Sequence, residues 1–113
     1  MADQIRIRDA GGNWVVRAGG AVIGESAAAL EVTHGDRDPV IYFPRDGIAM
    51  AFLEPSTTRV KDPHLGEARH FSIQTKSVLI ADAVWSFETP KPGYEKLAGH
   101  LAFDTTKATV EEI

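Results

Sequence analysis

The sequence of 113 residues contains no cysteine. A chain without thiols forms no disulfide bonds and no thiolate zinc sites, and it carries out neither thiol redox chemistry nor nucleophilic catalysis by cysteine. Disulfide scaffolds, zinc-thiolate modules and thiol enzymes are therefore excluded before any motif is considered.

Long hydrophobic runs are also missing. No apolar segment approaches the about 20 residues that a membrane-spanning helix needs. The start, MADQIRIRDAGG, has charges spread through it and no apolar core of a secretory signal. We therefore expect a cytoplasmic protein that has no membrane partner.

Positive charge is in short supply. The chain has 12 lysines and arginines against 16 acids, which gives a net charge of −4. Binding to nucleic acid depends on a basic face that releases counterions from phosphates, and no run of lysine or arginine supplies one. We expect no nucleic-acid partner.

The composition that remains is that of an ordinary globular protein, with 43% hydrophobic and 25% charged residues. A chain of this length suits one hydrophobic core, so residues 1–113 are predicted to form a single domain. The sequence contains no internal repeat and no low-complexity segment.

Alternation of apolar and polar residues dominates the chain and predicts strands. In residues 4–8 the isoleucines point one way and the polar residues the other, as in a half-buried strand. Strand-like residues 13–17 and 21–24 flank Gly19-Gly20, a pair suited to a tight hairpin turn. Further strand-like runs lie at residues 29–33, 40–43, 70–75, 78–87, 101–103 and 108–112.

Helical pattern is scarce. Residues 94–98 lie between Pro92-Gly93 and Gly99 and predict one short helical turn. Residues 45–53 predict a turn that passes into another strand, because Ile48, Met50 and Phe52 alternate. The predicted fold class is mainly β: a small sandwich or partly open barrel of about eight short strands, with one or two short helical turns.

The common catalytic and nucleotide-binding motifs are absent. No Gly-x-Gly-x-x-Gly or Gly-x-x-x-x-Gly-Lys sequence opens a helix, so a phosphate-binding loop is not supported. No Gly-x-Ser-x-Gly motif presents a nucleophilic serine either.

Histidines are the first candidate site residues. Asp62, His64, His70 and His100 would form a zinc, iron or manganese site if the fold gathered them. The alternative is that His64 and His70 are polar residues beside a turn, and that His100 binds a backbone group. Because Pro63 and Gly66 predict a turn there, we expect no cofactor and keep Asp62, His64 and His70 only as weak metal candidates.

Aromatic residues and one arginine form the second group. Trp85 lies on a predicted strand and suits either the core or the edge of a binding cleft, since its ring carries one N–H donor. Arg45 follows the strand end Tyr42-Phe43-Pro44 and either clamps an anionic ligand or is a solvated turn residue.

Five ordered blocks carry a resemblance to a known family, over roughly residues 14–112. The blocks are Tyr42-Phe43-Pro44-Arg45, Leu53-Glu54-Pro55-Ser56, Pro63-x-x-Gly66-Glu67-Ala68, Asp82-Ala83-x-Trp85-Ser86 and Gly99-His100-Leu101-Ala102-Phe103. In this order they resemble single-domain bacterial members of the Domain of Unknown Function 427 family.

The resemblance implies a fold rather than an activity. It implies a compact β-tent domain similar to the methionine sulfoxide reductase B and cereblon ligand-binding domains, whose relatives often hold a zinc ion and a small ligand in an aromatic cleft. A nucleotidyltransferase-like label attached to the family has no support in this sequence, which lacks a phosphate loop and paired metal-binding acids in a Gly-Ser context.

One block departs from the family pattern. Members commonly read Cys-Pro-x-Lys-Gly, where this chain has Asp62-Pro63-His64-Leu65-Gly66. An aspartate and a leucine cannot replace a thiol and an amine as nucleophile and proton handler. Any chemistry that relatives perform with that pair is therefore not expected here, and enzymatic activity stays an open question.

Three functional hypotheses follow. The leading one is a domain that binds a small molecule in a cleft edged by Arg45, His64, Glu67, His70, Trp85 and His100. The second is a hydrolase or lyase with a histidine as general base, with or without a metal. The third is a structural or interaction module, either a monomer or a homodimer paired through a strand edge.

Overall fold

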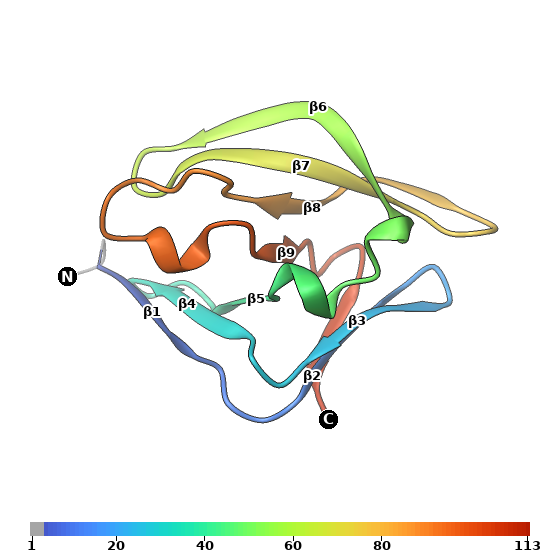
Figure 1. Ribbon diagram of the computed structural model, residues 1–113, viewed down its shortest axis with the longest axis horizontal. Coiled ribbons are helices and arrows are strands. Elements are labelled where there is room, and N and C mark those ends of the chain that lie inside the picture. Colours follow the sequence, from blue (N-terminus) through green and yellow to red (C-terminus); the bar gives the residue numbers. More distant parts are fainter. Residues whose placement is uncertain (1–3) are drawn as a thin grey trace.

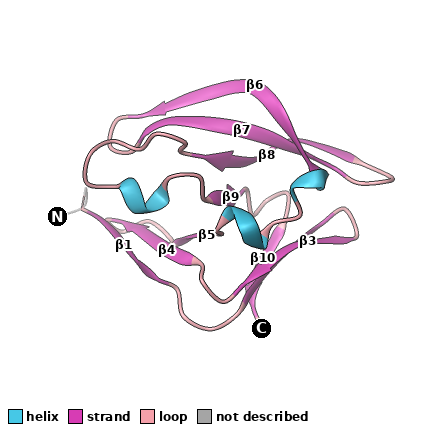
Figure 2. Ribbon diagram, in the orientation of Figure 1, coloured by secondary structure: helices cyan, strands magenta, loops and turns pink. Residues whose placement is uncertain are grey.

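The computed structural model describes residues 4–113 as an all-β fold (Figure 1). These residues form ten strands and three short 3₁₀ turns (Figure 2). The elements are β1 (Ile5–Asp9), β2 (Trp14–Ala18), β3 (Ala21–Ser26), β4 (Leu30–His34), β5 (Val40–Tyr42), η1 (Arg45–Gly47), η2 (Met50–Phe52), β6 (Leu53–Asp62), β7 (Gly66–Gln74), β8 (Leu79–Ser86), η3 (Glu95–Leu97), β9 (Leu101–Phe103) and β10 (Thr109–Glu112). The predicted fold class is confirmed.

The strands form three antiparallel sheets, of order β1-β4-β5, β10-β2-β3 and β6-β7-β8-β9. The four-stranded sheet lies above the other two in Figure 1, and they slope away beneath it. Strands β5 and β9 approach each other because Phe43 and Leu101 exchange two backbone hydrogen bonds of 2.8 Å. Over residues 4–113 the sheets do not close into a barrel.

The predicted hairpin at the start of the chain is confirmed. Strands β2 and β3 pair across Gly19 and Gly20, whose φ angles are +56° and +80°. Two successive residues with positive φ form the type of tight turn that matches strand twist, and glycine adopts it without steric cost.

Two parts of the fold differ from the sequence prediction. Strand β6 was not predicted. It is an edge strand in which most residues are exposed, so its sequence shows little alternation of apolar and polar residues. The strand expected around Ile48, Met50 and Phe52 is instead occupied by η1 and η2, and strand structure begins only at Leu53. The predicted turn at residues 94–98 is confirmed as η3.

The two faces of strands β7, β8 and β9 pack into different cores. Phe71, Val84 and Phe103 lie in one row across β7, β8 and β9 and pack into the core that contains Val16 and Ile23. Because side chains alternate along a strand, the adjacent row points to the other face. That adjacent row is His70, Trp85 and Ala102.

The second core lies between this other face and the sheet β1-β4-β5. Ala102 packs there with Leu30, Val32 and Tyr42, and Trp85 is partly buried against them. The sheet pairing thus directs Trp85 and His70 toward β4 and β5, which sets the position of the candidate site.

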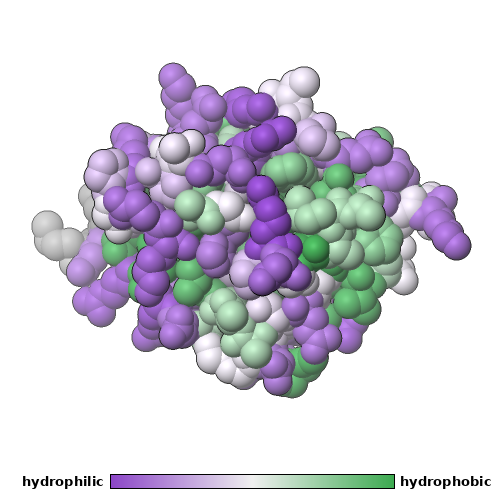
Figure 3. Space-filling model, in the orientation of Figure 1, coloured by the Kyte–Doolittle hydropathy of each residue, from purple (hydrophilic) through white to green (hydrophobic). Residues whose placement is uncertain are grey.

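Apolar side chains also reach the surface. Val22, Val78 and Leu79 are 53%, 38% and 56% exposed. Figure 3 shows hydrophobic side chains gathered at the right-hand end of the molecule, where the β2–β3 and β7–β8 hairpins lie in Figure 1.

Candidate functional site

A cleft of about 320 Å³ opens between β4-β5 and the His70-Trp85 face of the four-stranded sheet. Its apolar walls come from both sides, and they include Val32, Tyr42, Leu65, Ala68, Trp85 and Phe87. Its polar lining residues are His34, Arg37, Asp38, Asp62 and His70. The cleft therefore combines an aromatic wall with groups of both charges.

Trp85 and Tyr42 are joined across this cleft wall. Trp85 Nε1 donates a hydrogen bond to Tyr42 Oη over 3.1 Å, which links β8 to β5. Burial, opposed by the Trp85 bond and assisted by the negative charge of Asp62, raises the pKa of Tyr42 to about 12. The phenol is therefore neutral at physiological pH, and its own hydrogen can be donated.

A backbone irregularity before Trp85 sets the direction of the strand. The β7–β8 register shifts between Phe71 and Ile73, and Asp82 opposite this shift has a φ of +51°. Asp82 accepts a 2.8 Å hydrogen bond from Thr58 Oγ1, and its N–H donates to Ser72 Oγ. Hydrogen bonds from Ser56 and Thr58 hold the pKa of Asp82 below its usual value, which keeps the carboxylate charged in this bulge.

Asp62 has a structural role in the turn between β6 and β7. Its Oδ1 accepts the backbone N–H groups of His64 and Leu65 at 2.8 and 3.0 Å. An aspartate that bonds the backbone in this way stabilises a tight turn, and Gly66 completes it with a φ of +115°. The predicted turn at Pro63 and Gly66 is confirmed.

Two histidines border the cleft and a third touches one of them. His70 lies in the wall, and its Nδ1 is buried with no hydrogen-bond partner among residues 4–113. A tautomer with the proton on Nε2 leaves no buried unpaired donor at Nδ1. The His64 ring packs edge-on against His34, with ring centroids 5.0 Å apart.

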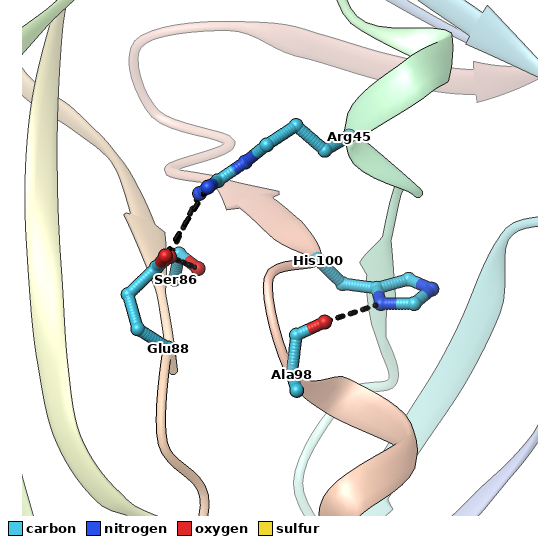
Figure 4. Close-up of polar contacts among 5 residues, drawn as sticks. All are labelled: Arg45, Ser86, Glu88, Ala98 and His100. Carbon is cyan, nitrogen blue, oxygen red and sulfur yellow. Dashed lines mark hydrogen bonds and ion pairs between the residues drawn. The ribbon is translucent and has the colours of Figure 1, made fainter.

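Arg45 belongs to a different group of residues. It binds both carboxylate oxygens of Glu88 at 3.1 and 2.7 Å, and Ser86 Oγ also donates to Glu88 (Figure 4). Burial disfavours the charged carboxylate, but the hydrogen bonds from Arg45 and Ser86 outweigh it and hold the pKa of Glu88 below its usual value. The guanidinium, which from the sequence was either a ligand clamp or a solvated turn residue, binds a protein carboxylate.

Glu67 and His100 also lie away from the cleft lining. Glu67 is exposed and reaches Arg59 at 4.0 Å. His100 Nδ1 lies 3.4 Å from the carbonyl oxygen of Ala98, and its ring points away from the Arg45–Glu88 pair (Figure 4). Of the six candidate ligand-binding residues, the fold brings His70 and Trp85 into the cleft and His64 beside its rim, whereas Arg45, Glu67 and His100 are elsewhere.

No metal site is formed by the weak candidates. Within the described part of the chain, no three His, Cys, Asp or Glu side chains lie close enough together to hold an ion. Asp62, His64 and His70 are therefore not a ligand set in this arrangement.

Sequence reasoning missed the loop between β4 and β5. His34, Arg37 and Asp38 come from or beside this loop and line the cleft. The available signal was the run His-Gly-Asp-Arg-Asp-Pro at residues 34–39, a dense group of polar residues at a turn. Loops that carry such groups on a rigid sheet often form binding sites.

The fold and the cleft together define a small all-β domain with an aromatic-walled cleft. Residues 6–113 match the family model described as a domain of unknown function (DUF427), so the chain belongs to this family. A search among curated proteins finds no significant match. Within residues 4–113, no helix has the length and apolar character needed to cross a bilayer.

Proposed function

We propose that this protein binds a small, flat, uncharged molecule in the cleft between β4-β5 and the His70-Trp85 face. The observation that carries the proposal is the Trp85–Tyr42 pair, whose 3.1 Å hydrogen bond fixes an aromatic wall before any ligand arrives. A preformed wall reduces the entropy that a ligand loses on binding.

The size of the cleft supports a ligand of about one ring. Its volume of about 320 Å³ lies at the lower end of the ~300–1,000 Å³ that is typical of small-molecule sites. Val32, Leu65 and Phe87 surround the ring with apolar contacts. Such a lining favours a planar, largely apolar body.

The polar groups support a ligand with a hydrogen-bond acceptor. The Tyr42 hydroxyl accepts from Trp85 and retains a hydrogen to donate, and His70 in the same wall supplies a second polar ring. The rim carries Arg37 as well as Asp38 and Asp62, so both signs of charge are present. A neutral carbonyl or ring nitrogen fits these groups better than an ion.

The geometry supports binding more than acid–base catalysis. A catalytic histidine is usually oriented by a carboxylate on its second ring nitrogen. The buried Nδ1 of His70 has no such partner among the described residues. Asp62, an acid of the cleft lining, instead accepts the backbone N–H groups of His64 and Leu65 in the turn.

Ligand-observed NMR with neutral aromatic amides, beginning with benzamide and nicotinamide, tests the proposal. Saturation transfer is expected for the wild-type protein and is expected to fall in Ala68→Met, which fills the cleft, and in His70→Gln. His100→Gln is the matched control, since this histidine lies outside the cleft lining. Absence of transfer to the whole set, or transfer that both cleft variants leave unchanged, would refute the proposal.

A further inference from the structure

We propose that a second cavity, which shares Trp85 with the cleft, binds the ammonium group of an organic cation. This cavity has a volume of about 600 Å³ and lies where β2, β5, β8 and β9 meet. Trp14 and Trp85 supply aromatic walls, and Glu31, Asp38 and Asp104 supply carboxylates. We refer to it as the two-tryptophan cavity.

Both indoles are held in place by hydrogen bonds that use their N–H groups. Trp14 Nε1 donates to the carbonyl oxygen of Gly11 at 2.8 Å, and Trp85 Nε1 donates to Tyr42 Oη at 3.1 Å. Indole has no other hydrogen-bond donor. The rings therefore offer π surface to the cavity and no donor for an anionic ligand.

The charged residues of the lining are all acidic. Glu31, Asp38 and Asp104 line the cavity, and its lining residues include no lysine, arginine or histidine. Arg8 pairs with Glu31 at 2.7 Å and offsets one of the three charges. The positive charge of Lys107 also acts on Asp104, although its Nζ donates its hydrogen bond to the carbonyl oxygen of Ala81 at 2.8 Å rather than to the carboxylate.

Asp104 keeps its charge for a local reason. Its Oδ1 accepts the backbone N–H and the hydroxyl of Thr106 at 2.9 and 2.6 Å. These hydrogen bonds hold the pKa of Asp104 below its usual value. The carboxylate is therefore ionised at the mouth of the cavity across the physiological range.

Aromatic faces and an excess of carboxylates together select a particular class of ligand. A methylated ammonium group is attracted to indole faces and to carboxylates, and its methyl groups tolerate the apolar contacts of Val40 and Phe103. A hard metal ion needs several oxygen ligands at once. The described residues contain no such cluster, so the structure favours the organic cation.

A titration with choline and its uncharged isostere 3,3-dimethyl-1-butanol, at constant ionic strength, tests the inference. The two indole N–H signals are followed in ¹H–¹⁵N spectra and assigned from Trp14→Phe. We expect choline to shift both signals saturably, and the alcohol to shift them little. Equal shifts from both compounds, or no shift from choline at its highest soluble concentration, would overturn the inference.

Charge variants give the second measurement. Asp104→Asn keeps a side chain that can bond Thr106, and Asp38→Asn is a separate variant that does not depend on it. Each is expected to weaken choline binding about fivefold, the order of effect expected from the loss of one partly exposed pair of opposite charges. Asp46→Asn is the matched control, because this exposed acid in η1 lies outside the cavity. Unchanged affinity in both cavity variants would remove charge from the explanation.

The two proposals fail separately. Trp14 lines only the two-tryptophan cavity, and His70 lines only the cleft. Amide fragments that perturb His70 without choline binding at Trp14 would leave the cleft proposal in place, and the reverse result would leave the cation site in place.

Discussion

Trp85 and Tyr42 are hydrogen-bonded across the join between two sheets, with Trp85 Nε1 3.1 Å from Tyr42 Oη. The Tyr42 side chain is buried and the Trp85 ring is partly buried, so the bond is shielded from water on one side. This contact holds Trp85, the aromatic residue that lines both proposed sites.

Removal of the phenol oxygen tests that contact. Tyr42→Phe leaves the indole N–H without its partner, and we expect the free energy of unfolding to fall by about 1–2 kcal/mol. Urea denaturation measures the change. Tyr94→Phe is the control, because Tyr94 packs against the same core and loses only a half-exposed hydroxyl. Equal losses in the two variants would contradict a specific role for the Trp85–Tyr42 bond.

The lowered pKa of Glu88 predicts that the folded protein loses stability in acid. Its pKa in the folded protein is below the ordinary 4.5, so the unfolded chain binds the proton more readily. The stabilisation is therefore complete above about 4.5 and is lost as the pH falls through the folded value. Denaturation curves from about pH 6 to about pH 3 measure this loss.

Glu88→Gln supplies the comparison for the pH series. The variant should be less stable than wild type at neutral pH and should lose less stability in acid. A residual slope is expected from Asp82, Glu95 and Asp104, whose pKa values are also lowered. Parallel curves for the two proteins would show that the Arg45–Glu88 pair does not couple folding to protonation.

At Gly24, where β3 meets η1, there is no room for a side chain. An added Cβ would lie 2.6 Å from the Gly47 carbonyl oxygen and 2.4 Å from Ile48 Cδ1. Because a backbone oxygen cannot move aside cheaply, Gly24→Ala should cost about 1–3 kcal/mol of unfolding free energy. Thermal and urea unfolding measure it.

The double variant Gly24→Ala/Ile48→Val separates the two contacts. The double variant removes the contact with Ile48 Cδ1 and keeps the contact with the Gly47 carbonyl oxygen. Ile48→Val alone should cost about 1 kcal/mol of unfolding free energy. We expect the double variant to be less stable than Ile48→Val by nearly the full cost of Gly24→Ala. Full recovery would place the strain on the isoleucine side chain instead.

The open edge of the four-stranded sheet predicts a monomer. Edge strand β6 contains Pro55, and its register with β7 is irregular between Pro55 and Arg59. Proline, charge and irregular pairing discourage edge-to-edge association. Val22, Val78 and Leu79 are exposed, and a few exposed apolar side chains are normal on a monomer. Light scattering coupled to size exclusion tests this, and a dimer that persists on dilution would refute it.

Much of the fold was predictable because local patterns agree with it. Alternation located β1, strand-like runs located β2, β3 and β9, and a glycine pair identified the hairpin of β2 and β3. Strand β6 was missed because an edge strand with both faces largely exposed carries little hydrophobic alternation. A turn was predicted within residues 45–53, and η1 and η2 lie there. The strand predicted around Ile48, Met50 and Phe52 begins only at Leu53, because alternation is also compatible with tight turns.

The site was less predictable because it depends on which strands meet. Trp85 and His70 are opposite each other through the β7–β8 pairing, and a bulge decides which way they face. Arg45 and His100 were both candidates for the cleft. No local pattern in the sequence indicated that Arg45 binds Glu88 or that His100 lies beside Ala98. The cleft loop at residues 34–39 faces the site only because β4 and β5 pack beneath that row.

The indole at position 85 forms part of both hollows, together with Val40 and Asp38. If both the cleft and the two-tryptophan cavity bind ligands, a ligand that tilts the Trp85 ring in one site changes the shape of the other site. Thermodynamic linkage then requires the effect to be reciprocal: each guest must change the affinity of the other by the same factor. The shared Trp85 side chain would then couple ligand binding in the cleft to ligand binding in the two-tryptophan cavity.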